Sequence, residues 1–242
     1  MELAMGIAFL LVAAWWLLLT VPLLTSYHQV YYQEASQHPV RACARRLAGV
    51  FSDLGKERKV LYFLIAFFFY IDGVYTIIDM ATAYGTALGL DTTGLLLALL
   101  LTQVVAFPAA LTFGKLSRKA PVARLMLICI GAYFCVALYA LGLREQYQFW
   151  ILAVCVGLFQ GAIQSMSRSY FAKIIPADKS GEYFGIYGIC GKGASFMGTM
   201  LVSVVSQITG STNLGVGALA FMFLAGFLLF IKADRTEMAS AK

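Results

Sequence analysis

The sequence predicts an all-α membrane protein with seven transmembrane helices, and three observations support this prediction. Seven apolar stretches each approach the roughly 20 residues that a helix rising about 1.5 Å per residue needs to cross the bilayer core. Runs such as residues 95–101 are apolar throughout and lack the alternation of a transmembrane strand. Nearly all Lys and Arg residues lie in alternate loops, as expected of helices that cross the membrane back and forth.

The first stretch stands apart from the other six. The stretches lie at about residues 3–25, 60–82, 92–113, 123–142, 147–170, 183–206 and 214–231. No Lys or Arg precedes the first one, which also carries the pair Trp15-Trp16, typical of a membrane interface. We therefore expect residues 1–26 to form a retained single transmembrane helix rather than a cleaved signal peptide.

A basic segment, residues 27–59, separates this helix from the rest. After Pro39, apolar residues from Val40 to Leu54 recur at helical spacing, with arginines between them. The pattern predicts a cytoplasmic amphipathic helix lying on the inner leaflet. A solvated linker with incidental periodicity is the alternative.

The six following stretches, within residues 60–232, predict one helical bundle. Short loops join them, so sequential helices should be antiparallel neighbours. They divide at Arg144 into three plus three, the pattern of two inverted three-helix repeats. Residues 233–242 would then form a cytoplasmic tail.

The distribution of charge predicts the orientation of the helices. One set of loops holds 15 of the 18 Lys and Arg residues, whereas the opposite loops hold only Arg144. By the positive-inside rule the first set is cytoplasmic, residue 1 lies outside and residue 242 inside, as in a multi-pass protein of a bacterial inner membrane. The net charge of +6 is thus a signal for topology, and nucleic acid is not an expected partner.

Four motifs resemble one transporter family. Residues 157–171 read GLFQGAIQSMSRSYF and look like the tenth-helix signature of the vacuole-effluxer-like family of the major facilitator superfamily. Residues 67–77 resemble that family's seventh helix, although Ile71 stands where the family usually has Asn. The segment GEYFG at 181–185, followed by Gly191-Lys192, is similar to the start of the eleventh helix, and GKLSRK at 114–119 to the superfamily's basic turn between the eighth and ninth helices.

This resemblance implies a place for the chain in a twelve-helix transporter. The single leading helix would be the sixth of twelve, the basic segment the central loop, and the bundle the C-terminal half. An N-terminal half would then be a missing partner, and the chain a fragment, one of two separately made halves, or a truncated product. The implied activity is alternating-access export of a small polar solute, with amino acids as the type substrate.

Two carboxylates inside one stretch are the first candidates for a site that binds the solute or couples proton movement. Asp72 and Asp79 are two helical turns apart, so both should share a face with Thr76 between them. Burial in lipid favours the protonated form, so Asp72 would couple proton movement or contact the solute. The alternative is a structural carboxylate bonded to a neighbouring helix, for example to Lys192.

Other polar residues inside the stretches complete the candidate set. Gln160 and Gln164 are four apart on one face and would bind the solute or hydrogen-bond across helices. Lys192 lies too deep to snorkel comfortably and needs a partner, and Gln103 is a further cavity candidate. The gating candidates, for which anchoring at the interface is the alternative, are Lys115, Arg118 and Arg168.

Enzyme chemistry finds no support in the sequence. It holds no phosphate loop, zincin motif or Ser-His-Asp arrangement, and both histidines, His28 and His38, fall in the basic segment. We expect no enzymatic activity, no cofactor and no metal site, with the bilayer and a small solute as partners. The function predicted is a secondary active transporter or half of one, with a non-transporting scaffold or inactive fragment as the alternative.

Overall fold

The computed structural model describes residues 2–28, 49, 54–55 and 57–236, and the chain divides into two units, 1–42 and 43–242. No strand occurs among the described residues, which confirms the all-α prediction. Seven helices are long and apolar enough to cross a membrane: Leu3–Ser26, Arg58–Ala87, Thr92–Leu116, Val122–Ala140, Gln146–Ile174, Ser180–Thr209 and Thr212–Arg235.

The first unit contains helix α1 (Glu2–Ser26), which is apolar on every face. Nearly all its described side chains are exposed, as suits a helix surrounded by lipid. Its two threonine hydroxyls are satisfied within the helix, because Thr20 and Thr25 donate to the carbonyls of Trp16 and Val21. The predicted amphipathic helix after Pro39 lies outside the described residues, apart from Gly49 and Leu54.

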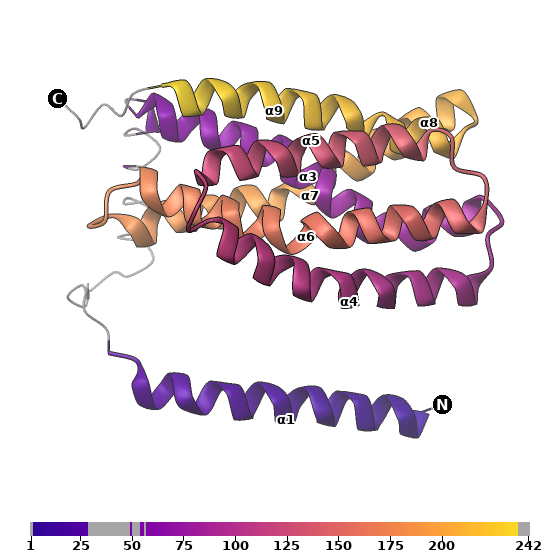
Figure 1. Ribbon diagram of the computed structural model, residues 1–242, viewed down its shortest axis with the longest axis horizontal. Coiled ribbons are helices and arrows are strands. Elements are labelled where there is room, and N and C mark those ends of the chain that lie inside the picture. Colours follow the sequence, from indigo (N-terminus) through magenta and orange to yellow (C-terminus); the bar gives the residue numbers. More distant parts are fainter. Residues whose placement is uncertain (1, 29–48, 50–53, 56, 237–242) are drawn as a thin grey trace. The chain divides into compact units, whose positions relative to one another are not determined.

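The second unit is a bundle of antiparallel helices (Figure 1). Its elements are α3 (Arg58–Ala87), α4 (Thr92–Leu116), α5 (Val122–Ala140), α6 (Gln146–Ile174), α7 (Ser180–Thr209), α8 (Thr212–Gly217) and α9 (Leu219–Arg235). The last membrane span is thus made of two helical segments, α8 and α9, which meet at Ala218.

The packing of the helices has the internal symmetry of two three-helix repeats. Helix α3 packs on α9 and α7, α6 packs on α5 and α4, and α5 packs on α9. Exchanging α3 with α6, α4 with α7, and α5 with α9 converts this set of pairs into itself. Since α3 and α6 run in opposite directions, the repeats are inverted, which confirms the predicted architecture.

The two ends of the bundle differ in charge. Helices α4, α6 and α9 finish at one end of the bundle, where α3, α5 and α7 begin, and we call this end the basic end. Its cations are Arg58, Lys59, Lys115, Arg118, Lys119, Arg124, Lys173, Lys179, Lys232 and Arg235. The opposite end, formed by the turns at 88–91, 141–145 and 210–211, holds only Arg144 among its described cations.

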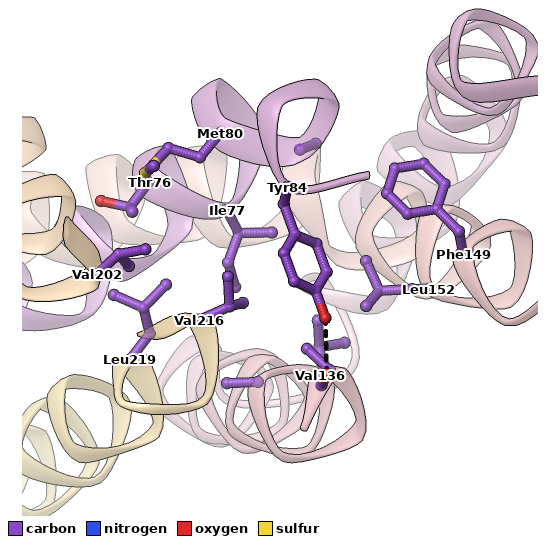
Figure 2. Close-up of a pocket in the computed structure, with 13 residues that line it drawn as sticks. Thr76, Ile77, Met80, Tyr84, Val136, Phe149, Leu152, Val202, Val216 and Leu219 are labelled. Atoms are coloured by element: carbon purple, nitrogen blue, oxygen red, sulfur yellow. Dashed lines mark hydrogen bonds between the residues drawn. The ribbon is translucent and has the colours of Figure 1, made fainter. Parts of the chain in front are cut away.

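A polar clamp closes the opposite end. The Tyr84 hydroxyl donates to the carbonyl oxygen of Ala140 at 2.7 Å (Figure 2). It also lies 3.2 Å from Oδ1 of Asn213. Asn213 Nδ2 in turn donates to the carbonyl oxygens of Leu143, at 2.9 Å, and Leu141, at 3.3 Å. One tyrosine and one asparagine therefore join α3, the α5–α6 turn and α8.

Removing the asparagine is expected to weaken the bundle. Asn213→Ala leaves two turn carbonyls and the Tyr84 hydroxyl with fewer partners, which should lower the free energy of unfolding by about 1–3 kcal/mol. Gln207→Ala is the matched control, because Gln207 is exposed and bonds only to Ser203 among the described residues. Thermal unfolding in micelles, followed by tryptophan fluorescence, measures both. Equal melting temperatures for the two variants would show that the clamp does not stabilise the fold.

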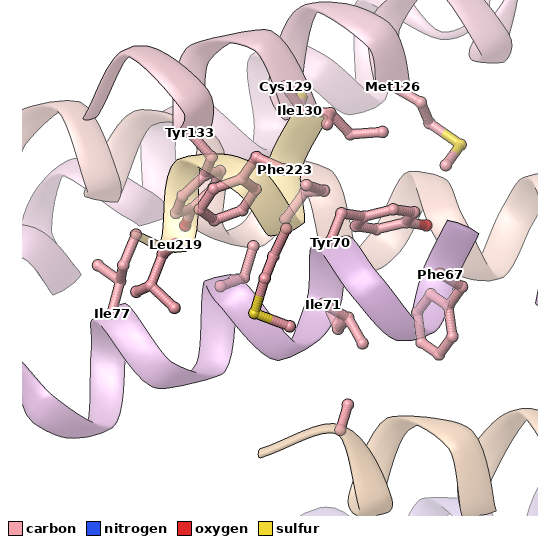
Figure 3. Packing of buried hydrophobic residues seen from close by; sticks show 14 of the residues in the cluster. Phe67, Tyr70, Ile71, Ile77, Met126, Cys129, Ile130, Tyr133, Leu219 and Phe223 are labelled. Carbon is pink, nitrogen blue, oxygen red and sulfur yellow. The ribbon is translucent and has the colours of Figure 1, made fainter. Parts of the chain in front are cut away.

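Aromatic rings on α3, α5, α6 and α9 pack together within the largely aliphatic core. Phe63 packs its ring against Tyr170 and Phe171, with centroids 5.2 and 5.5 Å apart. Tyr133 of α5 stacks on Phe223 of α9 at 5.5 Å (Figure 3). Such pairs add to the apolar burial that fixes the mutual positions of the helices. Most of α3 is buried in this core, and its residues Tyr75 and Asp79 are among the less buried ones.

Candidate functional site

An open polar hollow of about 520 Å³ lies between α3, α6 and α7. Its three charged side chains, Asp79, Arg168 and Lys192, are all exposed. The lining residues are Phe67, Ile71, Tyr75, Asp79, Gln164, Arg168, Tyr187, Gly188, Gly191, Lys192 and Ser195. Two cations and one anion thus face the same hollow, together with an uncharged amide and two tyrosines.

Helical periodicity explains why these residues share a surface. Helix α3 contributes every fourth residue from Phe67 to Asp79, and α6 contributes Gln164 and Arg168, also four apart. Residues at this spacing lie one above another on a helix. On α7 the lining includes Gly188 and Gly191, whose missing side chains leave room above the α3 surface.

Two aromatic contacts stiffen the hollow. The rings of Phe67 and Tyr187 stack with centroids 4.1 Å apart and join α3 to α7. The Arg168 guanidinium lies over the Phe184 ring at 5.5 Å from its centroid, a cation–π contact that orients the charge without neutralising it. No hydrogen bond or ion pair joins Lys192 to any other described residue, so its ammonium group is free to bind an anionic group.

The two predicted carboxylates have different surroundings. Asp79 is exposed in the hollow, whereas Asp72 is fully buried where α7 crosses α3. The nearest groups to Asp72 are the Thr76 hydroxyl and the backbone at Gly198, and neither closes a hydrogen bond of ordinary geometry with it. Nor does a described contact join Asp72 to Lys192. Although the two carboxylates are two turns apart on one helix, α7 covers α3 at Asp72 and leaves Asp79 open.

The predicted glutamines are also separated. Gln164 lines the hollow, but Gln160 lines a second, much smaller pocket of about 40 Å³ together with Gln103. That volume has room for about one water molecule. The Gln160 Oε1 atom is buried and has no hydrogen-bond partner among the described residues. The separation arises because α4 packs tightly against α6 at Gly157 and covers one side of the helix.

The gating candidates also fall into two groups. Arg168 lines the hollow, whereas Lys115 and Arg118 do not. Lys115 is exposed in the last turn of α4, and Arg118 is exposed in the turn between α4 and α5. Sequence reasoning missed Tyr75 and Tyr187 as lining residues. The four-residue spacing of Phe67, Ile71, Tyr75 and Asp79 was the signal available for the first of them.

A further pocket on the other side of α3 is apolar. Ile77, Val136, Phe149, Leu152 and Leu219 line it, and the Tyr84 hydroxyl there is already bonded (Figure 2). Besides that hydroxyl, such a lining offers a polar solute only the hydroxyl of Thr76, so the hollow beside Asp79 is the better candidate.

Comparisons with known proteins agree with this architecture. The model of the vacuole effluxer Atg22-like family matches residues 1–240. An uncharacterized MFS-type transporter, YxiO, of Bacillus subtilis is 41% identical over 226 residues, which cover 93% of this chain and 53% of that protein. Autophagy-related protein 22 of Eremothecium gossypii is 28% identical over 227 residues, covering 84% of this chain and 44% of that protein. The chain thus spans about half the length of these relatives.

Proposed function

Because this chain belongs to the vacuole effluxer Atg22-like family of membrane transporters, we propose that it is a secondary active transporter, or half of one, for a small zwitterionic solute. Amino acids are the solute class that we favour. The observation that carries the proposal is the presence of both signs of charge in one open hollow.

The charges of the hollow match those of an amino acid. A solute carboxylate can accept charge-assisted hydrogen bonds from Lys192 and Arg168, and a solute ammonium group can donate to Asp79. Gln164 offers both a donor and an acceptor for remaining polar groups. The stacked rings of Phe67 and Tyr187 provide an apolar surface for the solute's carbon atoms.

Alternating access requires a helix that can change its packing. Helices α4 and α7 are the least buried spans of the bundle, whereas α3 and α9 are the most buried. Helix α7 also lines the hollow and has open space beside Gly188 and Gly193. We therefore assign the movement to α7 on a core formed by α3 and α9.

The proposal includes the setting of the bundle. The positive-inside rule places the basic end in the cytoplasm, with a bacterial inner membrane as the location. A second, N-terminal half would cover the open side of the hollow and complete a two-sided cavity. Lys115 and Arg118 would then act at the cytoplasmic end, away from the solute.

Binding of matched solutes tests this function. Radiolabelled amino acids should bind to the chain in lipid nanodiscs, whereas the corresponding amines without a carboxylate and acids without an ammonium group should bind far more weakly. Flux of the bound amino acid is then measured in proteoliposomes of the chain alone and joined to a six-helix first half. Equal binding of all three solute types would contradict the zwitterion assignment, and the absence of flux in both forms would favour a scaffold.

A further inference from the structure

The feature that the solute site leaves unexplained is the buried carboxylate of Asp72. Its side chain is fully buried in the contact between α3 and α7, outside the hollow. Both carboxylate oxygens and the hydroxyl of Thr76, one turn later, are buried and lack hydrogen-bond partners among the described residues. A buried polar group without a partner is rare in native structures and points to a specific role.

The backbone of α7 lies directly against this pair. A side chain at position 198 would collide with the Thr76 hydroxyl and come within 3.0 Å of the Asp72 carboxylate, so only glycine fits there. Asp72 and Thr76 are both fully buried, so bulk water does not reach the carboxylate while α7 stays in place. A charged Asp72 would then have neither water nor a cation to stabilise it.

Among the described residues, no charged side chain acts on Asp72. On the helices packed nearby, Tyr70 is bonded to Ser167, and Tyr133 stacks on Phe223. The remaining candidates line the hollow instead: Tyr75, Asp79, Arg168, Tyr187 and Lys192. The charge on Asp72 thus depends on whether α7 covers it, and not on a neighbouring ion.

We propose that Asp72 is a proton-binding site, separate from the solute hollow, whose occupancy holds α7 against α3. The proposal rests on the transport function inferred above, and it gives that function a coupling site. When the proton is bound, the neutral acid remains buried beside Thr76 and Gly198. When the proton leaves, the carboxylate requires water, and α7 must move away from α3 to admit it.

A proton fits the site better than a metal cation. Hard cations take about six or more oxygen ligands, whereas only three unpartnered oxygens meet here, two from Asp72 and one from Thr76. No cluster of three metal-ligating side chains occurs in the described part of the chain. The site therefore offers too few ligands for a bound metal ion.

The α4–α6 pair, which corresponds to the α3–α7 pair by the internal symmetry, shows that a polar group buried at such a close glycine contact can have hydrogen-bond partners. In the α4–α6 contact, Gly157 also approaches the partner backbone, at Thr102. The Thr102 hydroxyl, however, donates to the carbonyl oxygens of Ala98, at 2.9 Å, and Ala153, at 3.2 Å. That pair is closed by hydrogen bonds, whereas the α3–α7 pair holds an acid without a partner.

Infrared difference spectroscopy of the full chain in liposomes tests the proton site directly. We expect the carbonyl band of a protonated carboxyl group at low pH, its loss as the pH rises, its absence in Asp72→Asn, and a shifted band in Thr76→Val. Asp178→Asn, at an exposed position that does not line the hollow, is the matched control and should keep the band. A band that persists in Asp72→Asn, no titrating band in the native chain, or replacement of the proton by added sodium would each overturn the proposal.

The movement of α7 needs a second measurement. Spin labels at Ala83→Cys and Ser203→Cys, in a background without the native cysteines, report the separation of α3 and α7, since both positions are exposed at one groove. The distance distribution should broaden at high pH in the native background and stay narrow at every pH in Asp72→Asn. A distribution independent of pH in both backgrounds would overturn the coupling of the proton to α7.

The two proposals can fail independently. If Asp72→Asn loses the infrared band but the native chain does not bind zwitterions, the proton site is supported and the assigned solute is rejected. Zwitterion binding without a titrating band would keep the solute site and reject the proton site.

Discussion

The variants Lys192→Gln and Asp79→Asn are expected to weaken solute binding by about 10- to 100-fold each, the effect of losing one charge-assisted contact of about 1.4–2.8 kcal/mol. Each variant removes one of the two charge signs that the hollow presents. Both residues are exposed, and neither side chain forms a hydrogen bond or ion pair with another described residue. Membrane insertion and folding of the variants should therefore be unchanged. The effect should therefore appear in the dissociation constant and not in the melting temperature.

Two neutralisations elsewhere serve as controls. Lys173→Gln and Asp178→Asn change the same residue types at exposed positions that do not line the hollow. Equilibrium binding of a labelled amino acid in nanodiscs compares all four variants at equal ionic strength. If the control variants lose as much affinity as Lys192→Gln and Asp79→Asn, general electrostatic attraction and not the hollow determines binding.

A methyl group added at Gly226 is expected to destabilise the bundle by forcing two closely packed helices apart. The Cβ of an alanine there would lie 2.9 Å from Tyr70 Cβ, 3.1 Å from the Tyr70 backbone nitrogen and 3.2 Å from the Ala66 carbonyl oxygen. Backbone atoms cannot rotate away as a flexible side chain can. Helices α9 and α3, which form the most extensive contact of the bundle, must therefore separate.

We expect Gly226→Ala to lower the free energy of unfolding by about 1–3 kcal/mol, the usual cost of overpacking. The matched control is Gly131→Ala on α5, where nothing lies within 4 Å of the new Cβ. That control should be neutral or stabilising by up to about 1 kcal/mol, since alanine has the higher helix propensity. Chemical unfolding in mixed micelles measures both. A Gly226→Ala variant as stable as the control would show that α9 and α3 are not packed as closely as described.

The membrane helices were the most predictable part of the fold. Hydropathy predicted every span, but it placed one at 60–82 where the helix runs from Arg58 to Ala87, and another at 147–170 where it runs from Gln146 to Ile174. Polar residues at the ends of a span can remain helical, because the helix satisfies its own backbone hydrogen bonds in water as well as in lipid. Hydropathy cannot detect such extensions.

The break at Ala218 shows a second limit of hydropathy. Residues 214–231 form one apolar stretch in the sequence, yet α8 and α9 are separate segments. Near the break, a side chain at Gly217 would collide with Leu141 of the α5–α6 turn. This constraint comes from a residue far away in the sequence, so no local pattern reveals it.

The candidate site was predictable in its residues but not in its grouping. Ionisable groups in a membrane span are unusual enough to single out Asp72, Asp79 and Lys192 from sequence alone. Which of them meet depends on where α7 crosses α3, and the crossing point is set by Gly198. The spacing of seven residues therefore predicts that Asp72 and Asp79 share one helical face. It does not predict that α7 covers Asp72 and leaves Asp79 exposed.

The two symmetry-related contacts, α3–α7 and α4–α6, give this protein an internal reference for studies of its environment. Both pairs cross the same bilayer and depend on a glycine at the crossing point, so a change of lipid thickness or lateral pressure acts on both. Of the two crossing glycines, only Gly198 has a titratable side chain, Asp72, lying against it. Labels placed on both pairs of one molecule would thus separate the influence of the membrane from that of the proton.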